Sequence, residues 1–404
     1  MQKVIITPCH LEGRVTPPPS KSFLHRGLFC SALAGDLSLC EIPASYKISV
    51  DVAVSLQCLK QLLAAEKSGE RIILNCRESG TTLRFIIPVL AALGIEAVVK
   101  GEGRLPSRPL AEYEKVFGNS GINLVLPGNG KFLPLEISGK LSPGTFHLPG
   151  GVSSQYFSGL LLALSLLDSD SEIVITTPLE SEPYVNMTLD VMKHFGVAAK
   201  RTERGYLVPG KQQYRTDKQY VAEVDFSQAS FWLLAAYLGH DINVENLPER
   251  TSQGDSAFSS ILKEFLKKTD DVCEIDVSQT PDIVPPLAAA ASASGRTAKI
   301  INAKRLRYKE SDRIESTLAM LHSFGVHAES FSDGMIIYPH KLPYSAGVVD
   351  GAGDHRIVMT AAVMATRASG EVTINGSNAI TKSYPDFFEV FRAIGGRANE
   401  LDLG

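Results

Sequence analysis

The sequence lacks several features that define large classes of proteins. Its 40 Lys and Arg nearly balance its 44 Asp and Glu, and the net charge of -4 argues against a general nucleic-acid or membrane-surface binder. None of the six cysteines has CxxC or CxH spacing, which argues against a disulfide framework and against a zinc site. The longest apolar stretch, residues 85–99, contains Pro88 and is shorter than a membrane span.

The sequence is also long enough to fill two domains. With 404 residues, of which 44% are hydrophobic and 21% charged, the chain exceeds one ordinary domain and can bury two full cores. The apolar run within MQKVIITPCH is too short for a signal peptide. We therefore expect a two-domain cytoplasmic protein with reduced cysteines.

Six amphipathic segments begin with serine, a residue that commonly caps helix N-termini. Pro follows several of these serines, and Gly follows several of the segments, as expected at helix starts and ends. We therefore predict six serine-capped outer helices. The capping residues would be Ser49, Ser107, Ser181, Ser252, Ser311 and Ser383.

A second kind of segment alternates with the first. It begins with polar residues and then becomes small and apolar on all sides, which is typical of a helix buried all round. These segments are residues 20–35, 79–94, 153–167, 227–239, 281–295 and 353–370. Short β-rich runs lie between the helices, including KVIIT, EIVITT, AKIINA, GMIIYP and EVTING.

This alternation predicts an α/β fold built from repeats. Six copies of strand, buried helix and capped outer helix suggest two similar domains, each with three repeated βαβαββ-type units. The sheets would lie outside and the Ala-rich helices inside. General helix propensities could produce similar caps, but all six caps recur in step with all six buried helices. The repetition indicates architecture and carries no information about activity.

The polar starts of the buried helices need partners, because an unsatisfied polar group inside a core is costly. If the repeats pack side by side, the helix N-termini of each domain point the same way. Two facing domains would then enclose a cleft lined with helix N-termini and cations, which suits phosphates and carboxylates. The stretch PPPSKSFLHR places Lys21 and Arg26 in such a start, where the helix dipole disfavours cations. A solvated basic turn is the alternative, although GLFCSALAG offers no polar face to hold it there.

Other charged residues have ordinary explanations as well. In YKESDRI, Glu310 and Asp312 suit a helix start as dipole partners, so a structural role and a functional role are equally open. Arg108 and Lys382 could each be solvated charges. Asp282 leads directly into a buried apolar helix and therefore needs a partner or a shifted pKa.

Nine motifs together resemble one family, the 5-enolpyruvylshikimate-3-phosphate synthases, also called 3-phosphoshikimate 1-carboxyvinyltransferases. The resemblance covers essentially the whole chain. In order, the motifs are SKSFLHR, SGTTLR, RLPSRPL, SSQ, SEPY, PD, KESDR, GDHR and TKSYPDFFE.

The resemblance implies the enolpyruvyl transferase fold, an inside-out α/β barrel, with one domain at 20–223 and the other formed by 1–19 and 224–404. The implied reaction transfers the enolpyruvyl group of phosphoenolpyruvate to the 5-hydroxyl of shikimate 3-phosphate and releases phosphate. It proceeds by addition and elimination, in the shikimate pathway to chorismate and the aromatic amino acids. The resemblance further implies no metal or organic cofactor. We expect a monomer whose partners are these small-molecule substrates.

Site residues follow from the resemblance, motif by motif. Asp282 would be the general base, and Glu310 would protonate the methylene carbon of phosphoenolpyruvate and then remove a proton. Lys21 would lie near both substrates, and His355 would assist proton movement or orient its neighbours. Shikimate 3-phosphate would contact Lys21, Ser22, Arg26, Ser153, Ser154, Gln155, Ser181, Tyr184, Asp282 and Lys309. Phosphoenolpyruvate would contact Lys21, Gly80, Arg108, Gln155, Arg313, Arg356 and Lys382.

The chain departs from the family at three positions. Glu78 stands where many members have Asn, Phe85 where Pro is frequent, and Arg305 where many have an Asn that contacts substrate. These departures bear on loop detail and affinity. Gly80 is unsubstituted, whereas many glyphosate-insensitive members carry Ala, so we predict inhibition by glyphosate in competition with phosphoenolpyruvate.

Two other functions remain possible from the sequence. A sister family transfers enolpyruvyl to UDP-N-acetylglucosamine on the same repeat architecture, but it carries a Cys in the loop that here reads GEGRLPSRPL. A noncatalytic anion-binding relative would be expected to lose some of Asp282, Glu310 and Lys382, and all three are present.

Overall fold

The computed structural model describes residues 2–118 and 120–402. The chain divides into two compact units, each with its own hydrophobic core. Unit 1 contains Met1–Pro18 and Val224–Gly404, and unit 2 contains Pro19–Glu223. The chain therefore leaves unit 1 after its first two strands and returns to it near residue 224.

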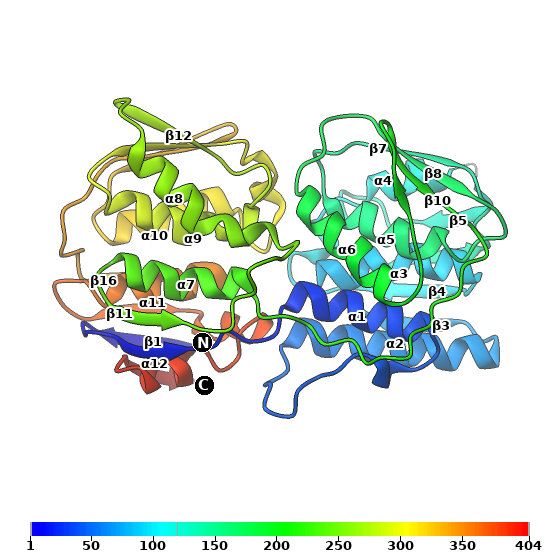
Figure 1. The fold of residues 1–404 in the computed structure, drawn as a ribbon, viewed down its shortest axis with the longest axis horizontal. Helices are drawn as coiled ribbons and strands as arrows, with labels where there is room; N and C mark the ends of the chain where they lie inside the picture. The colour runs from blue at the N-terminus through cyan, green and yellow to red at the C-terminus, as the bar shows by residue number, and fades with distance from the viewer. Residues whose placement is uncertain (1, 119, 403–404) are drawn as a thin grey trace. The chain divides into compact units, whose positions relative to one another are not determined.

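Six inner helices form the centres of the units (Figure 1). Unit 2 contains α1 (Lys21–Leu33), α3 (Gly80–Leu93) and α5 (Ser154–Leu164), and unit 1 contains α7 (Phe226–Tyr237), α9 (Val284–Ser292) and α11 (His355–Ala365). Nearly all their residues are buried, as expected for helices without a polar face. In unit 1 the three inner helices contact one another, and in unit 2 α3 contacts both α1 and α5. The six buried helices predicted from the sequence are confirmed.

Small residues allow these helices to approach closely. Gly159 on α5 faces the Arg84 carbonyl of α3, and a Cβ at this position would overlap that oxygen. In α9, a run of four alanines, Ala288–Ala291, is completely buried. Short side chains thus let the inner helices pack against one another with little space between backbones.

Six outer helices alternate with the inner ones along the chain. They are α2 (Val50–Ser68), α4 (Ala111–Phe117), α6 (Glu182–His194), α8 (Phe258–Lys267), α10 (Arg313–Ser323) and α12 (Phe387–Ala393).

The predicted serine caps of the outer helices are mostly wrong. Ser49 and Ser181 are N-cap residues, but neither side chain forms a capping hydrogen bond. The N-caps of the other four helices are Leu110, Ala257, Asp312 and Asp386, so Ser107, Ser252, Ser311 and Ser383 cap none of them.

Side-chain caps occur instead mainly on inner helices. Ser20, Ser79, Ser153, Asp225 and Asp354 each accept a backbone N–H at the start of α1, α3, α5, α7 and α11. The physical reason is burial. The orphan N–H groups of a buried helix cannot reach water and need a protein acceptor. Burial does not account for the missing caps of α2 and α6, because Ser49 and Ser181 are buried as well.

Four sheets share one strand order. In each, two parallel strands are followed by two antiparallel ones. Unit 2 contains β3 (Ile72–Asn75), β4 (Ala97–Lys100), β6 (Leu135–Gly139) and β5 (Ile122–Val125), then β7 (Thr145–Leu148), β8 (Ser171–Ile175), β10 (Gly205–Val208) and β9 (Lys200–Arg201). Unit 1 contains β12 (Val272–Asp276), β13 (Thr297–Ile301), β15 (Gly334–Ile337) and β14 (Ala328–Phe331), then β16 (Gly347–Asp350), β17 (Val372–Asn375), β1 (Gln2–Thr7) and β18 (Arg397–Asp402). The five predicted strand runs are confirmed as β1, β8, β13, β15 and β17.

The remaining two repeats have smaller sheets. One keeps the parallel pair β2 (Glu12–Val15) and β11 (Asp241–Val244), and the other keeps only a bridge between Cys40 and Tyr220. These are the repeats next to the two chain crossings between the units. Among the described residues, no helix is long and apolar enough to cross a membrane.

Candidate active site

The predicted site residues form two groups, and most of them lie at or near helix starts. Unit 2 holds Lys21, Ser22, Arg26, Gly80, Arg108, Ser153, Ser154, Gln155, Ser181 and Tyr184. Unit 1 holds Asp282, Lys309, Glu310, Arg313, His355, Arg356 and Lys382. Each group is a separate cluster of charges within its own unit.

Lys21 at the start of α1 has an internal partner. Its Nζ lies 2.9 Å from Asp51 Oδ2, on the first turn of α2. Both side chains are largely buried. Asp51 therefore supplies part of the negative charge that a lysine at a helix N-terminus requires.

Arg26 is buried among neutral acceptors. Its Nε donates to Thr188 Oγ1 at 2.8 Å, its Nη1 to Ser22 O at 2.7 Å and its Nη2 to Tyr184 O at 2.7 Å. Burial lowers the pKa of Arg26 to about 10, and no carboxylate of the described residues pairs with it. The guanidinium keeps a full positive charge at neutral pH without a counter-ion.

Two more guanidiniums meet at Gly80. A Cβ on Gly80 would lie 2.7 Å from Arg108 Nη1 and 3.0 Å from Arg84 Nη1. Arg84 donates to Gln155 Oε1 and to Pro109 O, both at 3.0 Å. Gln155 Nε2 in turn donates to Thr81 Oγ1 at 2.9 Å. Two positive side chains, Arg84 from α3 and Arg108 from the segment before α4, thus meet at the start of α3, around a residue that has no side chain of its own.

The predicted serines of unit 2 have structural roles in this state. Ser153 Oγ accepts from Gln155 N at the start of α5. Ser154 is buried as the first residue of that helix. Ser181, the N-cap of α6, has a positive φ of 54°, which is uncommon for a residue with a side chain and signals local strain.

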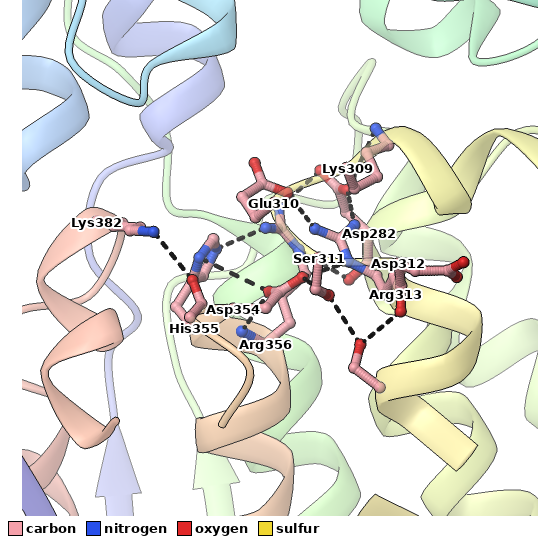
Figure 2. Close-up of polar contacts among 12 residues, drawn as sticks. Asp282, Lys309, Glu310, Ser311, Asp312, Arg313, Asp354, His355, Arg356 and Lys382 are labelled. Atoms are coloured by element: carbon pink, nitrogen blue, oxygen red, sulfur yellow. Dashed lines mark hydrogen bonds and ion pairs between the residues drawn. The ribbon is translucent and has the colours of Figure 1, made fainter. Parts of the chain in front are cut away.

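In unit 1, Arg313 binds three carboxylates at once (Figure 2). Its Nε lies 2.9 Å from Asp354 Oδ2, its Nη1 2.9 Å from Asp282 Oδ1 and its Nη2 2.5 Å from Glu310 Oε2. The Arg313 side chain is completely buried, and Arg313 is the first residue of α10. These neighbours hold the pKa of Arg313 above its usual range, although burial alone would lower it.

Asp282 lies in the short helix η4 (Pro281–Ile283) and is surrounded by cations. Besides Arg313, Arg356 Nη2 lies 2.7 Å from its Oδ2, and Lys309 Nζ lies 3.8 Å from its Oδ1. Burial would raise the pKa of Asp282, but Arg356, Lys309 and Arg313 outweigh it and hold the pKa far below the usual value. The carboxylate is therefore ionised and, while so held, a weak base.

Lys309 has a lowered pKa. Burial, opposed by Asp282, brings the pKa of Lys309 to about 8. This residue follows η5 (Lys304–Tyr308), in which the buried Arg305 donates to the Ser278 carbonyl. The lysine is mostly protonated at neutral pH and loses its charge in mild alkali.

The start of α11 carries the rest of the unit 1 group. Arg356 Nη1 contacts His355 Nε2 at 2.6 Å, and its Nε donates to Asp282 O at 3.2 Å. Lys382 Nζ donates to Gly353 O at 2.9 Å, which brings it to the same helix start. Figure 2 shows the side chains of α10 and α11 converging here.

Sequence reasoning assigned no role to several residues of these groups. Asp51, Arg84 and Asp354 bind predicted site residues directly. Asp255 is buried, and Ser227 donates to it; burial, followed by Asp282, raises the pKa of Asp255 to about 7. Arg84 and Asp354 do lie within the SGTTLR and GDHR motifs, so their position at buried helix starts was the available signal. Asp51 had no such signal.

The departures from the family lie close to these groups. Phe85 is buried in the unit 2 core, with the Arg26 guanidinium 5.3 Å from its ring centroid. Arg305 is buried one helical turn before Lys309. Both side chains are larger than those that the resemblance implies at these positions, and both lie near predicted site residues.

Comparison with known proteins places the chain in a family. The sequence model described as EPSP synthase (3-phosphoshikimate 1-carboxyvinyltransferase) matches residues 6–391. The chain is 38% identical over 430 residues to a protein of Clostridium acetobutylicum named 3-phosphoshikimate 1-carboxyvinyltransferase, covering 100% of both. It is 35% identical to the Clostridioides difficile protein of the same name, again covering 100% of both.

Solved structures show the same fold. EPSP synthase from Acinetobacter baumannii matches with a TM-score of 0.77 at 22% identity, covering 100% of both chains. The enolpyruvyl transferase NikO from Streptomyces tendae matches with a TM-score of 0.75 at 14% identity, covering 99% of both. The fold, the full-length relatives and the two charged groups agree, and the chain belongs to the EPSP synthase (3-phosphoshikimate 1-carboxyvinyltransferase) family.

Proposed function

We propose that this protein transfers the enolpyruvyl group of phosphoenolpyruvate to the 5-hydroxyl of shikimate 3-phosphate and releases phosphate. The observation that carries the proposal is the full-length match, at 35–38% identity, to proteins named 3-phosphoshikimate 1-carboxyvinyltransferase. Both substrates are multiply anionic. The buried guanidiniums at the helix starts of both units suit such substrates.

Shikimate 3-phosphate would bind the residues that the resemblance implies for it. In unit 2, Arg26 is a charged donor without a carboxylate partner, so an anion can satisfy it with little displacement. The full set of contacts is that expected from the sequence: Lys21, Ser22, Arg26, Ser153, Ser154, Gln155, Ser181, Tyr184, Asp282 and Lys309.

Phosphoenolpyruvate would bind the arginines around Gly80 and around Asp282. The absence of a side chain at Gly80 leaves Arg84 and Arg108 close to the same point. In unit 1, Arg313 and Arg356 would bind a substrate carboxylate with their outer nitrogens. The full set is Lys21, Gly80, Arg108, Gln155, Arg313, Arg356 and Lys382.

The chemistry needs two carboxylates in different protonation states. In the addition step, Asp282 takes the proton of the 5-hydroxyl, the oxygen bonds to C2 of phosphoenolpyruvate, and Glu310 gives a proton to C3. In the elimination step, Glu310 removes a proton from C3, the double bond re-forms, the bond between C2 and the phosphate oxygen breaks, and phosphate leaves with the proton that Asp282 had taken up. Lys21 would help to neutralise the departing phosphate, and His355 would orient Arg356, which it contacts.

Asp282 must lose its cations before it can act as a base. Its two oxygens are bound to Arg313 and Arg356 in this state. A substrate carboxylate that takes up these guanidiniums would raise the pKa of Asp282 toward the range in which a general base is effective. Phosphoenolpyruvate would thus raise the pKa of the base that acts on shikimate 3-phosphate.

A phosphate-release assay tests the function directly. Purified protein is given phosphoenolpyruvate with either shikimate 3-phosphate or UDP-N-acetylglucosamine. We expect phosphate release only with shikimate 3-phosphate. Release only with UDP-N-acetylglucosamine would assign the protein to the sister activity, and binding of the substrates without release would indicate a noncatalytic relative.

Four further expectations can be tested, the first two of them with the same assay. Glyphosate should inhibit in competition with phosphoenolpyruvate, and undiminished turnover at millimolar glyphosate with low phosphoenolpyruvate would contradict this. Turnover should persist after chelation of metals, because no cofactor is expected. Light scattering should give the mass of a monomer, and cell fractionation should place the protein in the cytoplasm.

A further inference from the structure

Asp354 is a fully buried carboxylate to which the proposed mechanism gives no role. It precedes α11, and its Oδ1 accepts from Arg356 N at 3.0 Å. Its Oδ2 accepts from Arg313 Nε at 2.9 Å and from Ser311 Oγ at 3.2 Å. One side chain therefore touches the starts of both α10 and α11.

The three carboxylates on Arg313 are not equivalent. Asp282 and Glu310 bind the outer nitrogens, and their side chains are 14% and 19% exposed. Asp354 binds the inner nitrogen Nε and is 0% exposed. A ligand that reaches Arg313 can displace the two partly exposed carboxylates but has no access to the fully buried one.

We propose that Asp354 is the positioning residue of the substrate carboxylate site. It is the permanent counter-ion of Arg313, whereas Asp282 and Glu310 exchange with the substrate. This inference rests on the proposed function, because it takes Arg313 and Arg356 as the groups that bind the carboxylate of phosphoenolpyruvate. Asp354 acts through these arginines and touches no substrate.

The capping contact extends this role to Arg356. By accepting the Arg356 N–H, Asp354 fixes the first turn of α11, from which both Arg356 and His355 project. Arg313 and Arg356 lie on different helices, and Asp354 joins them through two oxygens of one carboxylate. Two guanidiniums that bind one carboxylate must keep a fixed separation. Asp354 holds the guanidinium of Arg313 directly and, through the backbone, the helix turn from which Arg356 projects.

The proposal predicts a specific defect when only the charge is removed. Asn in place of Asp354 keeps an oxygen for the capping N–H but loses the ion pair to Arg313. Arg313 would then rely on Asp282 and Glu310, the two partners that the substrate has to displace. Affinity for phosphoenolpyruvate should fall, while shikimate 3-phosphate, whose proposed contacts are largely elsewhere, should bind normally.

The test measures kinetics of the Asp354→Asn enzyme with each substrate varied in turn. We expect KM for phosphoenolpyruvate to rise about 10- to 100-fold, the scale of a small misplacement of binding groups, and KM for shikimate 3-phosphate to change less than about twofold. The matched control is Asp312→Asn. Asp312 caps α10, and it pairs with Arg307 on the side away from the cluster. This control should leave both KM values unchanged.

Two further measurements separate positioning from simple damage to the fold. Fluorescence of Trp232, which is buried in unit 1 and is the single tryptophan, gives the unfolding midpoint of each variant. A double variant of Asp354→Asn with Arg313→Lys should have nearly the KM of Arg313→Lys alone, because Asp354 acts through Arg313. Multiplied defects in the double variant, or equal rises in both KM values, would overturn the proposal.

The experiment also distinguishes this proposal from the proposed function. If wild type transfers enolpyruvyl only to UDP-N-acetylglucosamine, the proposed acceptor is wrong. The KM for phosphoenolpyruvate of wild type and of Asp354→Asn is then compared with UDP-N-acetylglucosamine as the acceptor. If wild type turns over neither acceptor, calorimetric titration with phosphoenolpyruvate still compares Asp354→Asn with wild type. Equal affinities in either comparison would refute the role of Asp354.

Discussion

The buried arginines of the two units have different hydrogen-bond and ion-pair partners. In unit 2, Arg26 and Arg84 donate to hydroxyl, amide and carbonyl oxygens, and no carboxylate of the described residues pairs with either. In unit 1, Arg313 alone contacts three carboxylates, and Arg356 contacts one. Unit 2 therefore has positive charge available for an incoming anion, whereas unit 1 has to exchange internal partners. Binding without exchange suits a recognition site, and exchange suits a site where carboxylates must change protonation state.

The largest expected difference between the units concerns stability. Arg313→Gln leaves three buried or half-buried carboxylates without their common cation, so we expect unit 1 to lose about 3–5 kcal/mol, as when one partner of a buried ion pair is removed. Arg26→Gln leaves only neutral acceptors, so we expect unit 2 to lose about 1–3 kcal/mol. Urea unfolding followed by Trp232 fluorescence reports unit 1, and far-UV circular dichroism reports both units. A smaller loss for Arg313→Gln than for Arg26→Gln would contradict the comparison.

The next difference concerns which kinetic constant changes. Asp282→Asn and Glu310→Gln remove the proposed acid–base groups of unit 1, and each should lower kcat about 100-fold or more, the usual scale of lost proton transfer. Arg26→Gln should act mainly on KM for shikimate 3-phosphate, because Arg26 has no proton-transfer role. Steady-state kinetics of the three variants measure both constants. A normal kcat in Asp282→Asn would exclude Asp282 as the base.

A smaller effect is expected at Gly80. The added Cβ of Gly80→Ala would displace the guanidiniums of Arg108 and Arg84, because it would lie 2.7 and 3.0 Å from their nitrogens. We expect KM for phosphoenolpyruvate to rise about tenfold, which corresponds to about 1.4 kcal/mol of lost binding, and glyphosate to inhibit less strongly. Gly151→Ala is a suitable control, because its added Cβ meets only the side chain of Glu180 at 3.3 Å. Unchanged inhibition by glyphosate in Gly80→Ala would show that the arginines do not depend on this glycine.

Asp255 should make the stability of unit 1 depend on pH. Its pKa is about 7 in the folded protein against about 3.8 otherwise, so the folded state keeps a proton that the unfolded state loses between these values. The contribution of Asp255 to the stability of unit 1 should therefore fall as pH rises from about 4 to about 7, by up to about 1.4 kcal/mol per pH unit. His240, whose pKa burial lowers to about 4, contributes in the opposite direction, so the effect of Asp255 is read as the difference between wild type and variant. Asp255→Asn should remove this contribution in Trp232 fluorescence. An identical pH profile in the variant would refute it.

The contribution of His25 to the stability of unit 2 should have the opposite pH dependence. Burial, with Lys21 and Arg26 nearby, holds the pKa of His25 well below 6.5, and its Nδ1 contacts Ser55 Oγ at 2.7 Å. The unfolded chain binds a proton below about pH 6.5 that the folded protein excludes, so stability of unit 2 should fall as pH decreases. His25→Gln should flatten the acid side of the profile measured by circular dichroism. A profile unaltered by the substitution would rule out His25 as the cause.

Much of the fold could be predicted because buried helices and strands have clear sequence patterns. A helix without a polar face, such as 284–292, can only be buried, and each such segment became an inner helix. The caps were not predictable in the same way. Serine occurs before both kinds of helix, and Ser49 and Ser181 are buried N-cap residues of outer helices that form no capping hydrogen bond, whereas Ser20, Ser79 and Ser153 cap inner helices.

The candidate site was predictable in its composition but not in its pairing. Motifs identified Arg313, Asp282 and Glu310, yet the sequence contains no sign that one guanidinium binds both carboxylates and Asp354 as well. These residues are up to about 70 positions apart in the sequence. They meet because the N-terminal ends of η4, α10 and α11 lie next to one another in the fold. Asp51, the partner of Lys21, was missed for the same reason.

The sequence by itself determined that the chain forms six repeated helix pairs, which helices are buried, and that cations gather at their starts. Periodicity and residue type are local properties, and they suffice for these conclusions. The tertiary structure decided which charges face one another. Arg313 and Arg356 of unit 1 lie against carboxylates, and Arg26 and Arg84 of unit 2 lie against neutral oxygens, because partners distant in sequence come together only when the inner helices pack.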